Sequence, residues 1–66
     1  MTRAEHLAWA KARALEELER SGHINALASM ISDLRKHPEL ENHIGILLAV
    51  GCFTPDQAKR WIEGFR

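Results

Sequence analysis

The chain has 66 residues, a length that accommodates one domain with a small hydrophobic core. Nine basic and nine acidic side chains cancel, which argues against the global electrostatic field that drives bulk binding to nucleic acids or anionic membranes. The single cysteine, Cys52, excludes an internal disulfide, and the polar N-terminus has no features of a signal peptide, so we expect a cytoplasmic location.

The first predicted helix covers residues 3–20, which contain good helix formers and no Gly or Pro. Thr2 and Glu5 have the spacing of a capping box at its start. A rotation of about 100° per residue separates an inner side from an outer side. The inner side is expected to contain Ala4, Leu7, Ala8, Leu15 and Leu18, and the outer side Trp9, Arg13 and Arg20.

Ser21 and Gly22 are expected to end this helix, because glycine readily adopts the left-handed conformation found just past helix ends. The second predicted helix runs to Lys36, and Pro38 pushes His37 out of the helical region. Its expected buried side contains Ile24, Leu27, Ile31 and Leu34 with Ala28 and Met30 beside them, and its expected outer side contains Ser29, Ser32, Asp33, Arg35 and Lys36.

The third predicted helix covers residues 38–50 and includes most of an uncharged apolar run, residues 44–53. This run is too short to cross a bilayer, so it must be covered by the rest of the chain or by another copy. A glycine inside a helix, here Gly45, is best explained by a neighbouring helix that crosses close to its backbone.

A fourth helix of about ten residues is predicted after Thr54, whose cap is completed by Pro55, Asp56 and Gln57. Phe53 is expected to pack against Ala58. The buried side of this helix is expected to contain Ala58, Trp61, Ile62 and Phe65.

The short turns between the predicted elements favour an all-α fold with a single domain over residues 1–66. In this fold, four short helices form two stacked antiparallel helical hairpins, as in a small helical bundle. The alternative topology is a helix-turn-helix DNA reader, which needs a helix whose exposed side is rich in basic or amide side chains. Only part of such a side is present.

No motif in the sequence predicts a catalytic residue, a metal site or a cofactor site. The four histidines and Cys52 lack the spacings of metal ligands. Cys52 lies in an apolar stretch just after a predicted helix, which favours a small core side chain over a reactive thiolate. The cluster Glu16, Glu17 and Glu19 is better explained as a solvated face, supported by the pairs Arg13–Glu17 and Glu16–Arg20.

Two groups of side chains are candidate binding residues. Trp9, Arg13 and Arg20 have the composition of a protein-binding hot spot, and Arg13 can stack on Trp9. The alternative is that Trp9 packs against another helix of the same chain. Arg35, Lys36 and His37, near a helix end, form a possible anion-binding group. An exposed tryptophan and an apolar helix in a short chain also favour a homo-oligomer.

Three segments resemble a group of short uncharacterised helical proteins encoded by tailed phages and prophages. These are residues 29–39 (SMISDLRKHPE), the N-terminal MTRAE with the following WAKARALE, and the closing residues 62–65 (IEGF). The first turn departs from the group, because residues 22–25 (GHIN) replace a more usual Gly-Asp-hydrophobic pattern. The resemblance implies a small accessory protein that binds and blocks a component of the host cell, and it implies no site residues.

The leading hypothesis is therefore a non-enzymatic helical binding protein with a protein partner, acting in the host cytoplasm on a host component such as a defence system. Its contact residues would be Trp9, Arg13 and Arg20. The second hypothesis is an oligomer that sequesters a small anionic ligand such as a nucleotide, through Arg35, Lys36 and His37 or through Arg13 beside Trp9. DNA binding through basic patches ranks third and an enzyme ranks last. No membrane partner is expected.

Overall fold

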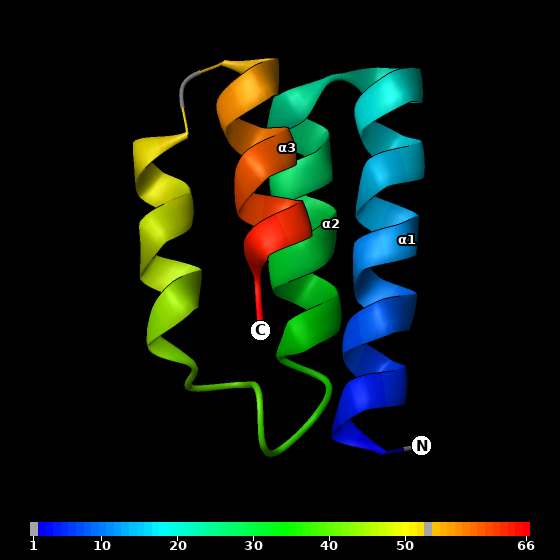
Figure 1. Ribbon diagram of the computed structural model, residues 1–66, viewed down its shortest axis with the longest axis vertical. Coiled ribbons are helices and arrows are strands. Elements are labelled where there is room, and N and C mark those ends of the chain that lie inside the picture. Colours follow the sequence, from blue (N-terminus) through cyan, green and yellow to red (C-terminus); the bar gives the residue numbers. More distant parts are fainter. Residues whose placement is uncertain (1, 53) are drawn as a thin grey trace.

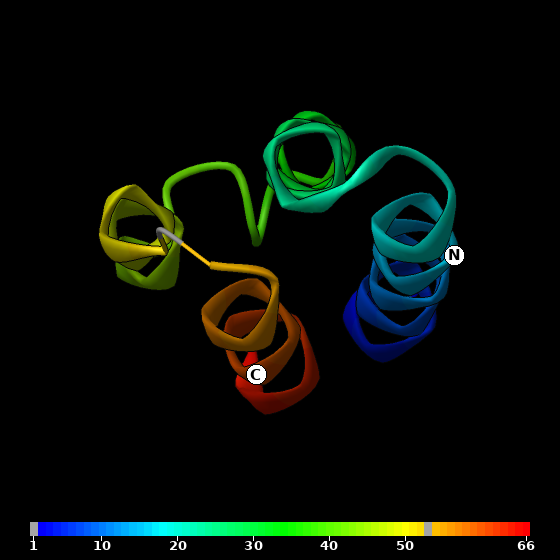
Figure 2. The same cartoon turned by 90° about the horizontal axis from the view of Figure 1, so that it is seen from above.

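The computed structural model describes residues 2–52 and 54–66, which form four helices and no strand. The helices are α1 (Arg3–Ser21), α2 (His23–Leu34), the 3₁₀ helix η1 (Ile44–Gly51) and α3 (Pro55–Gly64). The predicted all-α class is confirmed. Figure 2 shows the four helices nearly end-on, arranged around a common interior. The radius of gyration is 10.6 Å, close to the value of about 11 Å for a folded chain of this length.

The start and the end of α1 follow the prediction. The Thr2 hydroxyl accepts a hydrogen bond from the Glu5 amide at 3.1 Å, and the Glu5 carboxylate accepts one from the Thr2 amide at 3.0 Å. Gly22 follows Ser21 with a φ of 94°, a region that favours glycine. Because α2 begins at the next residue, a single residue joins α1 and α2 into an antiparallel hairpin (Figure 1).

The predicted buried sides of α1 and α2 are partly wrong. Ala4, Ala8 and Ala28 are exposed, and Ile24 is 73% exposed. The buried residues are His6, Leu7, Ala10 and Ala14 on α1, and Ala26, Leu27, Met30, Asp33 and Leu34 on α2. The small side chains of Ala10, Ala14 and Ala26 let the two helices approach closely, so that each helix buries a face rotated about its axis from the predicted face.

The predicted α-helix over residues 38–50 is wrong. The His37 carbonyl accepts hydrogen bonds from the amides of Leu40 and Glu41, both at 2.9 Å, in a turn whose Leu40 side chain is fully buried. His43 is extended, and its Nδ1 accepts a hydrogen bond from the Gly45 amide at 2.8 Å. This side-chain cap explains why the helix begins only at Ile44.

Gly45 is closely packed, as predicted, but by aromatic side chains and not by the backbone of a crossing helix. A Cβ atom at this position would lie 2.9 Å from Cε2 of Phe65. The Trp61 indole Nε1 donates a hydrogen bond to the Gly45 carbonyl at 2.9 Å. Two aromatic side chains from the C-terminal part of the chain therefore fix η1 against α3, and the two helices run in opposite directions (Figure 1).

Four large aliphatic side chains in the described part of the apolar run are not covered by the rest of the chain. Ile46 and Ala49 are buried. The exposed fractions of these four are 77% for Ile44, 67% for Leu47, 68% for Leu48 and 76% for Val50. Within the chain, the expectation of a covered run therefore fails for these four residues.

The last helix begins as predicted, with Thr54 and Gln57 forming a capping box before Pro55. Ala58, Ile62 and Phe65 are buried, and Trp61 is half-buried. The expected contact of Phe53 with Ala58 lies outside the described residues. The main core joins α1, α2, η1 and α3 through Leu7, Ala10, Ala14, Ala26, Met30, Leu34, Leu40, Ile46, Ile62 and Phe65.

Candidate functional site

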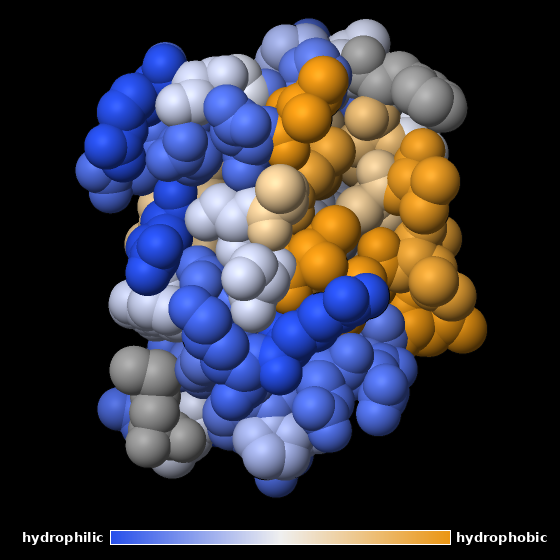
Figure 3. Space-filling model, turned by 180° about the vertical axis from the view of Figure 1, so that it is seen from behind, coloured by the Kyte–Doolittle hydropathy of each residue, from blue (hydrophilic) through white to orange (hydrophobic). Residues whose placement is uncertain are grey.

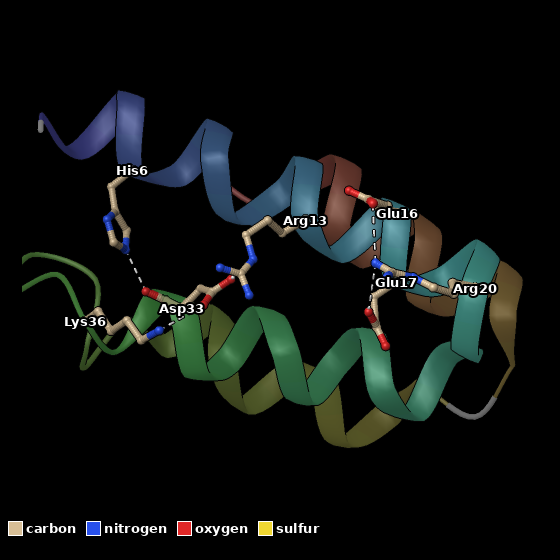
Figure 4. A network of polar contacts seen from close by, with 7 residues as sticks. All are labelled: His6, Arg13, Glu16, Glu17, Arg20, Asp33 and Lys36. Carbon is tan, nitrogen blue, oxygen red and sulfur yellow. Dashed lines mark hydrogen bonds and ion pairs between the residues drawn. The ribbon is translucent and has the colours of Figure 1, made fainter.

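A buried carboxylate, Asp33, connects the two helices of the hairpin. Its side chain is only 3% exposed. The Arg13 Nε lies 3.3 Å from Asp33 Oδ2, and the Lys36 Nζ donates a hydrogen bond to Oδ1 at 3.4 Å (Figure 4). Oδ2 has no hydrogen-bond partner among the described residues, so Arg13 compensates this buried oxygen by charge. The position of Asp33 corrects its predicted place on the outer side of α2.

His6 ties α1 to the same turn of α2. Its Nε2 lies 2.6 Å from the backbone carbonyl oxygen of Asp33. A carbonyl oxygen only accepts, so Nε2 carries a hydrogen and donates it. The His6 ring centroid also lies 5.2 Å from those of both Trp9 and His37. The contacts of buried His6 therefore hold Trp9 and the C-terminal end of α2 together.

Trp9 is half-buried and combines both of its predicted environments. Its indole packs against the main core, while the Arg13 guanidinium carbon lies 4.8 Å from the ring centroid. Lys36 Nζ lies 5.9 Å from the same centroid. Both distances fall within the range of cation–π contacts. We call Trp9, Arg13 and Lys36, which gather over buried Asp33, the Trp9 surface.

Arg20 is not part of the Trp9 surface. Its guanidinium pairs with the carboxylates of Glu16 at 3.3 Å and Glu17 at 3.6 Å (Figure 4). The predicted pair Glu16–Arg20 is thus present, whereas Arg13 pairs with Asp33 in place of Glu17. Exposed pairs of this kind on one helix contribute little to stability.

Arg35, Lys36 and His37 do not converge on a common point. Arg35 lines a groove beside η1, whereas Lys36 pairs with Asp33. The His37 Nδ1 accepts a hydrogen bond from the Glu39 amide at 3.1 Å, and its ring lies against His6. Lys36 therefore belongs with the Trp9 surface, and the three side chains do not form one anion pocket.

His6 and Asp33 are the site residues that sequence reasoning missed. The missed signal is the series Ala26, Met30 and Asp33, which are spaced i, i+4 and i+7 and so share one helix face. A charged residue on an apolar face predicts a buried ion pair when the neighbouring helix offers a cation. Arg13 supplies that cation.

Other reactive side chains have structural contacts. The half-buried Cys52 thiol lies 3.9 Å from the carbonyl oxygen of Leu48 and 3.8 Å from that of Gln57. In the part of the chain that the structure describes, no group of three or more His, Cys, Asp or Glu side chains is placed to hold a metal ion. None of the described helices is both long and apolar enough to cross a membrane.

Comparison with known proteins gives no match to a protein-family model, to a curated protein or to a solved structure. The function is therefore argued from the geometry of this chain.

Proposed function

We propose that this chain is a small non-enzymatic binding protein that contacts another protein through the Trp9 surface. The observation that carries the proposal is the Arg13 guanidinium placed 4.8 Å over the Trp9 ring while its Nε pairs with buried Asp33. Tryptophan and arginine are the residue types most enriched at the energetic centres of protein interfaces.

The buried Asp33 carboxylate holds Arg13 and Lys36 in place before a partner binds. The side chains of Arg13 and Lys36 remain 51% and 59% exposed, so a partner can reach both of them. Because each is already held by Asp33 and lies near the Trp9 ring, binding costs less side-chain entropy than it would for two free cations. The two cations favour a partner with carboxylates around an apolar contact. Arg20, two turns further along α1, would lie at the rim.

The biological role in this proposal comes from the resemblance to phage and prophage proteins. The protein would act in the host cytoplasm as a phage-type accessory protein that binds and inhibits a host component, for example part of a defence system. We treat η1 and α3 as a second antiparallel hairpin stacked on the first, which supports the Trp9 surface from behind. The ion pair of Asp33 with Arg13 fits a role in positioning a binding residue better than a role in catalysis.

The test is capture of host proteins on immobilised protein, compared among variants and followed by titration with the purified candidate. We expect Arg13→Ala and Trp9→Ala to weaken binding at least about 30-fold, as for hot-spot residues. Arg20→Ala removes an arginine of the same helix outside the Trp9 surface and is expected to change affinity less than about fivefold.

Arg13→Lys serves as a variant that keeps the charge beside Asp33 but loses the planar group that stacks on the indole. Circular dichroism of each variant verifies that the helices are intact. An unchanged partner and affinity in folded Trp9→Ala and Arg13→Ala would contradict the proposal.

A further inference from the structure

The 3₁₀ geometry of η1 sorts its side chains into straight rows. With three residues per turn, side chains at i and i+3 lie above one another. Ile46 and Ala49 form a buried row, whereas Ile44, Leu47 and Val50 form an exposed row. We call this exposed row the η1 ridge. Figure 3 shows hydrophobic side chains gathered in one area on the side of the molecule that it displays.

A groove of about 360 Å³ runs beside the η1 ridge. Its apolar wall is made by Ile44, Ile46 and Leu47. The chain therefore carries both a projecting aliphatic row and a hollow beside it. This combination allows two copies to pack ridge into groove, since in a two-fold dimer each copy offers the same surface to the other.

Two opposite charges lie at the edge of the same groove. Arg35 and Glu41 both line it, and both are exposed. Among the described residues, neither side chain has an ion-pair partner. A two-fold axis through the groove would bring Arg35 of each copy toward Glu41 of the other. The zero net charge of the chain adds no overall repulsion between copies.

We propose that the η1 ridge and its groove bind a second copy of this chain, with Arg35 and Glu41 forming two reciprocal ion pairs across the interface. This inference goes beyond the proposed function and uses a different surface. Helix η1 has eight residues, whereas 3₁₀ helices rarely exceed four. This length keeps the η1 ridge straight and exposed.

The available apolar area suits a dimer of small size. Covering one aliphatic side chain removes on the order of 100 Å² from water. The three side chains of the η1 ridge in two copies then bury about 600 Å², and the groove walls and charged rims add to this. The sum approaches the roughly 1200 Å² at which stable specific interfaces begin.

The first test is sedimentation equilibrium of the full chain. We expect a species of twice 7.5 kDa for the wild type and a monomer for Leu47→Asp, because a carboxylate at the centre of the η1 ridge cannot be buried without a partner. Leu47 is exposed, so circular dichroism of this variant is expected to match that of the wild type. A wild type that stays monomeric up to about 1 mM would overturn the proposal.

The second test reverses the rim charges. Arg35→Glu alone and Glu41→Arg alone each place like charges opposite one another in a homodimer, and we expect each variant to dimerise at least about tenfold more weakly. An equimolar mixture of the two variants restores both ion pairs in a heterodimer and is expected to recover wild-type association.

Lys59→Glu makes the same change of charge as Arg35→Glu, at an exposed position that does not line this groove. We expect it to dimerise like the wild type. If the mixture associates no better than the separate variants, or if Lys59→Glu weakens dimerisation as much as they do, the proposed arrangement is wrong. Dimerisation can fail here without any change in binding at the Trp9 surface, so the two proposals are tested separately.

Discussion

At the scale of single residues, Asp33 has the most consequential environment. It is buried on α2, yet its two cationic partners are half exposed and come from α1 and from the turn after α2. A buried carboxylate depends on such partners, because an uncompensated charge in the interior is strongly unfavourable. The stability of the hairpin and the order of the Trp9 surface are therefore coupled through one side chain.

We expect Asp33→Asn to lower the free energy of unfolding by about 1–3 kcal/mol, since it removes both ion pairs while keeping the size of the side chain. Arg20→Gln removes the exposed pairs with Glu16 and Glu17 and is expected to cost less than about 0.5 kcal/mol. Urea denaturation of the two variants measures both values. If the two variants lose the same free energy of unfolding, the buried ion pairs of Asp33 contribute no more to stability than the exposed pairs of Arg20.

Glu5 links stability to pH. Hydrogen bonds from the backbone amide and the hydroxyl of Thr2 hold the pKa of the Glu5 carboxyl below its ordinary value of 4.5. A carboxyl whose pKa is lower in the folded state stabilises the fold above its unfolded-state pKa. That contribution disappears as the pH falls through the folded-state pKa.

Glu5→Gln keeps the capping geometry without the titration. We expect the melting temperature of the wild type to fall relative to that of Glu5→Gln as the pH decreases below about 4.5. Thermal denaturation at neutral and acidic pH measures the difference. A constant difference at all pH values would contradict the assignment.

At the scale of helices, η1 depends on the close approach at Gly45. Gly45→Ala would bring a methyl group within 2.9 Å of the Phe65 ring and of the His43 Nδ1. Crowding of this kind costs about 1–3 kcal/mol, which exceeds the gain of roughly 1 kcal/mol from replacing glycine in a helix. We therefore expect a net loss of stability. Gly51→Ala, at the end of the same helix with open space around it, is the matched control and is expected to cost less.

The helix starts could be predicted because each depends on neighbouring residues. Thr2 with Glu5, and Thr54 with Gln57, carry the complete capping signal within four residues. The start of η1 could not be predicted in this way, because it depends on the His43 ring, whose centroid lies 4.6 Å from that of the tilted Phe65 ring. That ring contact joins residues 22 positions apart.

The faces that α1 and α2 turn toward each other also could not be predicted from neighbouring residues in the sequence. Hydrophobicity alone favours Ile24 and Ile31 over Ala26 as buried residues of α2, yet Ala26 is fully buried and Ile24 exposed. Close packing of alanines and the pairing of Asp33 with Arg13 together select the observed rotation. The candidate site follows from this rotation, so the sequence identified Trp9 and Arg13 but not their partners His6 and Asp33.

At the scale of the whole molecule, the two surfaces are formed by different helices and adjoin at the turn after α2, where Arg35 lines the η1 groove and Lys36 belongs to the Trp9 surface. The Trp9 surface is on the α1–α2 hairpin, whereas η1 stands at the edge of the molecule opposite α1 (Figures 1 and 2). A dimer through η1 would therefore present two Trp9 surfaces, one on each copy. Such a molecule can contact two partners at once, which raises its apparent affinity for a dense surface.

If both proposals hold, Leu47→Asp should dissociate faster from a densely immobilised partner while keeping the wild-type affinity for the same partner free in solution. Surface plasmon resonance at high and low partner density separates the two effects. A loss of affinity in solution would instead place the η1 ridge in the contact with the partner.

Because Gly22 alone connects α1 to α2, the connection affects the order in which the helices assemble during folding. Closing α1 onto α2 leaves almost no loop to restrain, so this hairpin can assemble early and at low entropic cost. The 3₁₀ helix joins later, after a longer turn, and contacts mainly α3. Hydrogen–deuterium exchange should accordingly protect the amides of α1 and α2 longest and release those of η1 first.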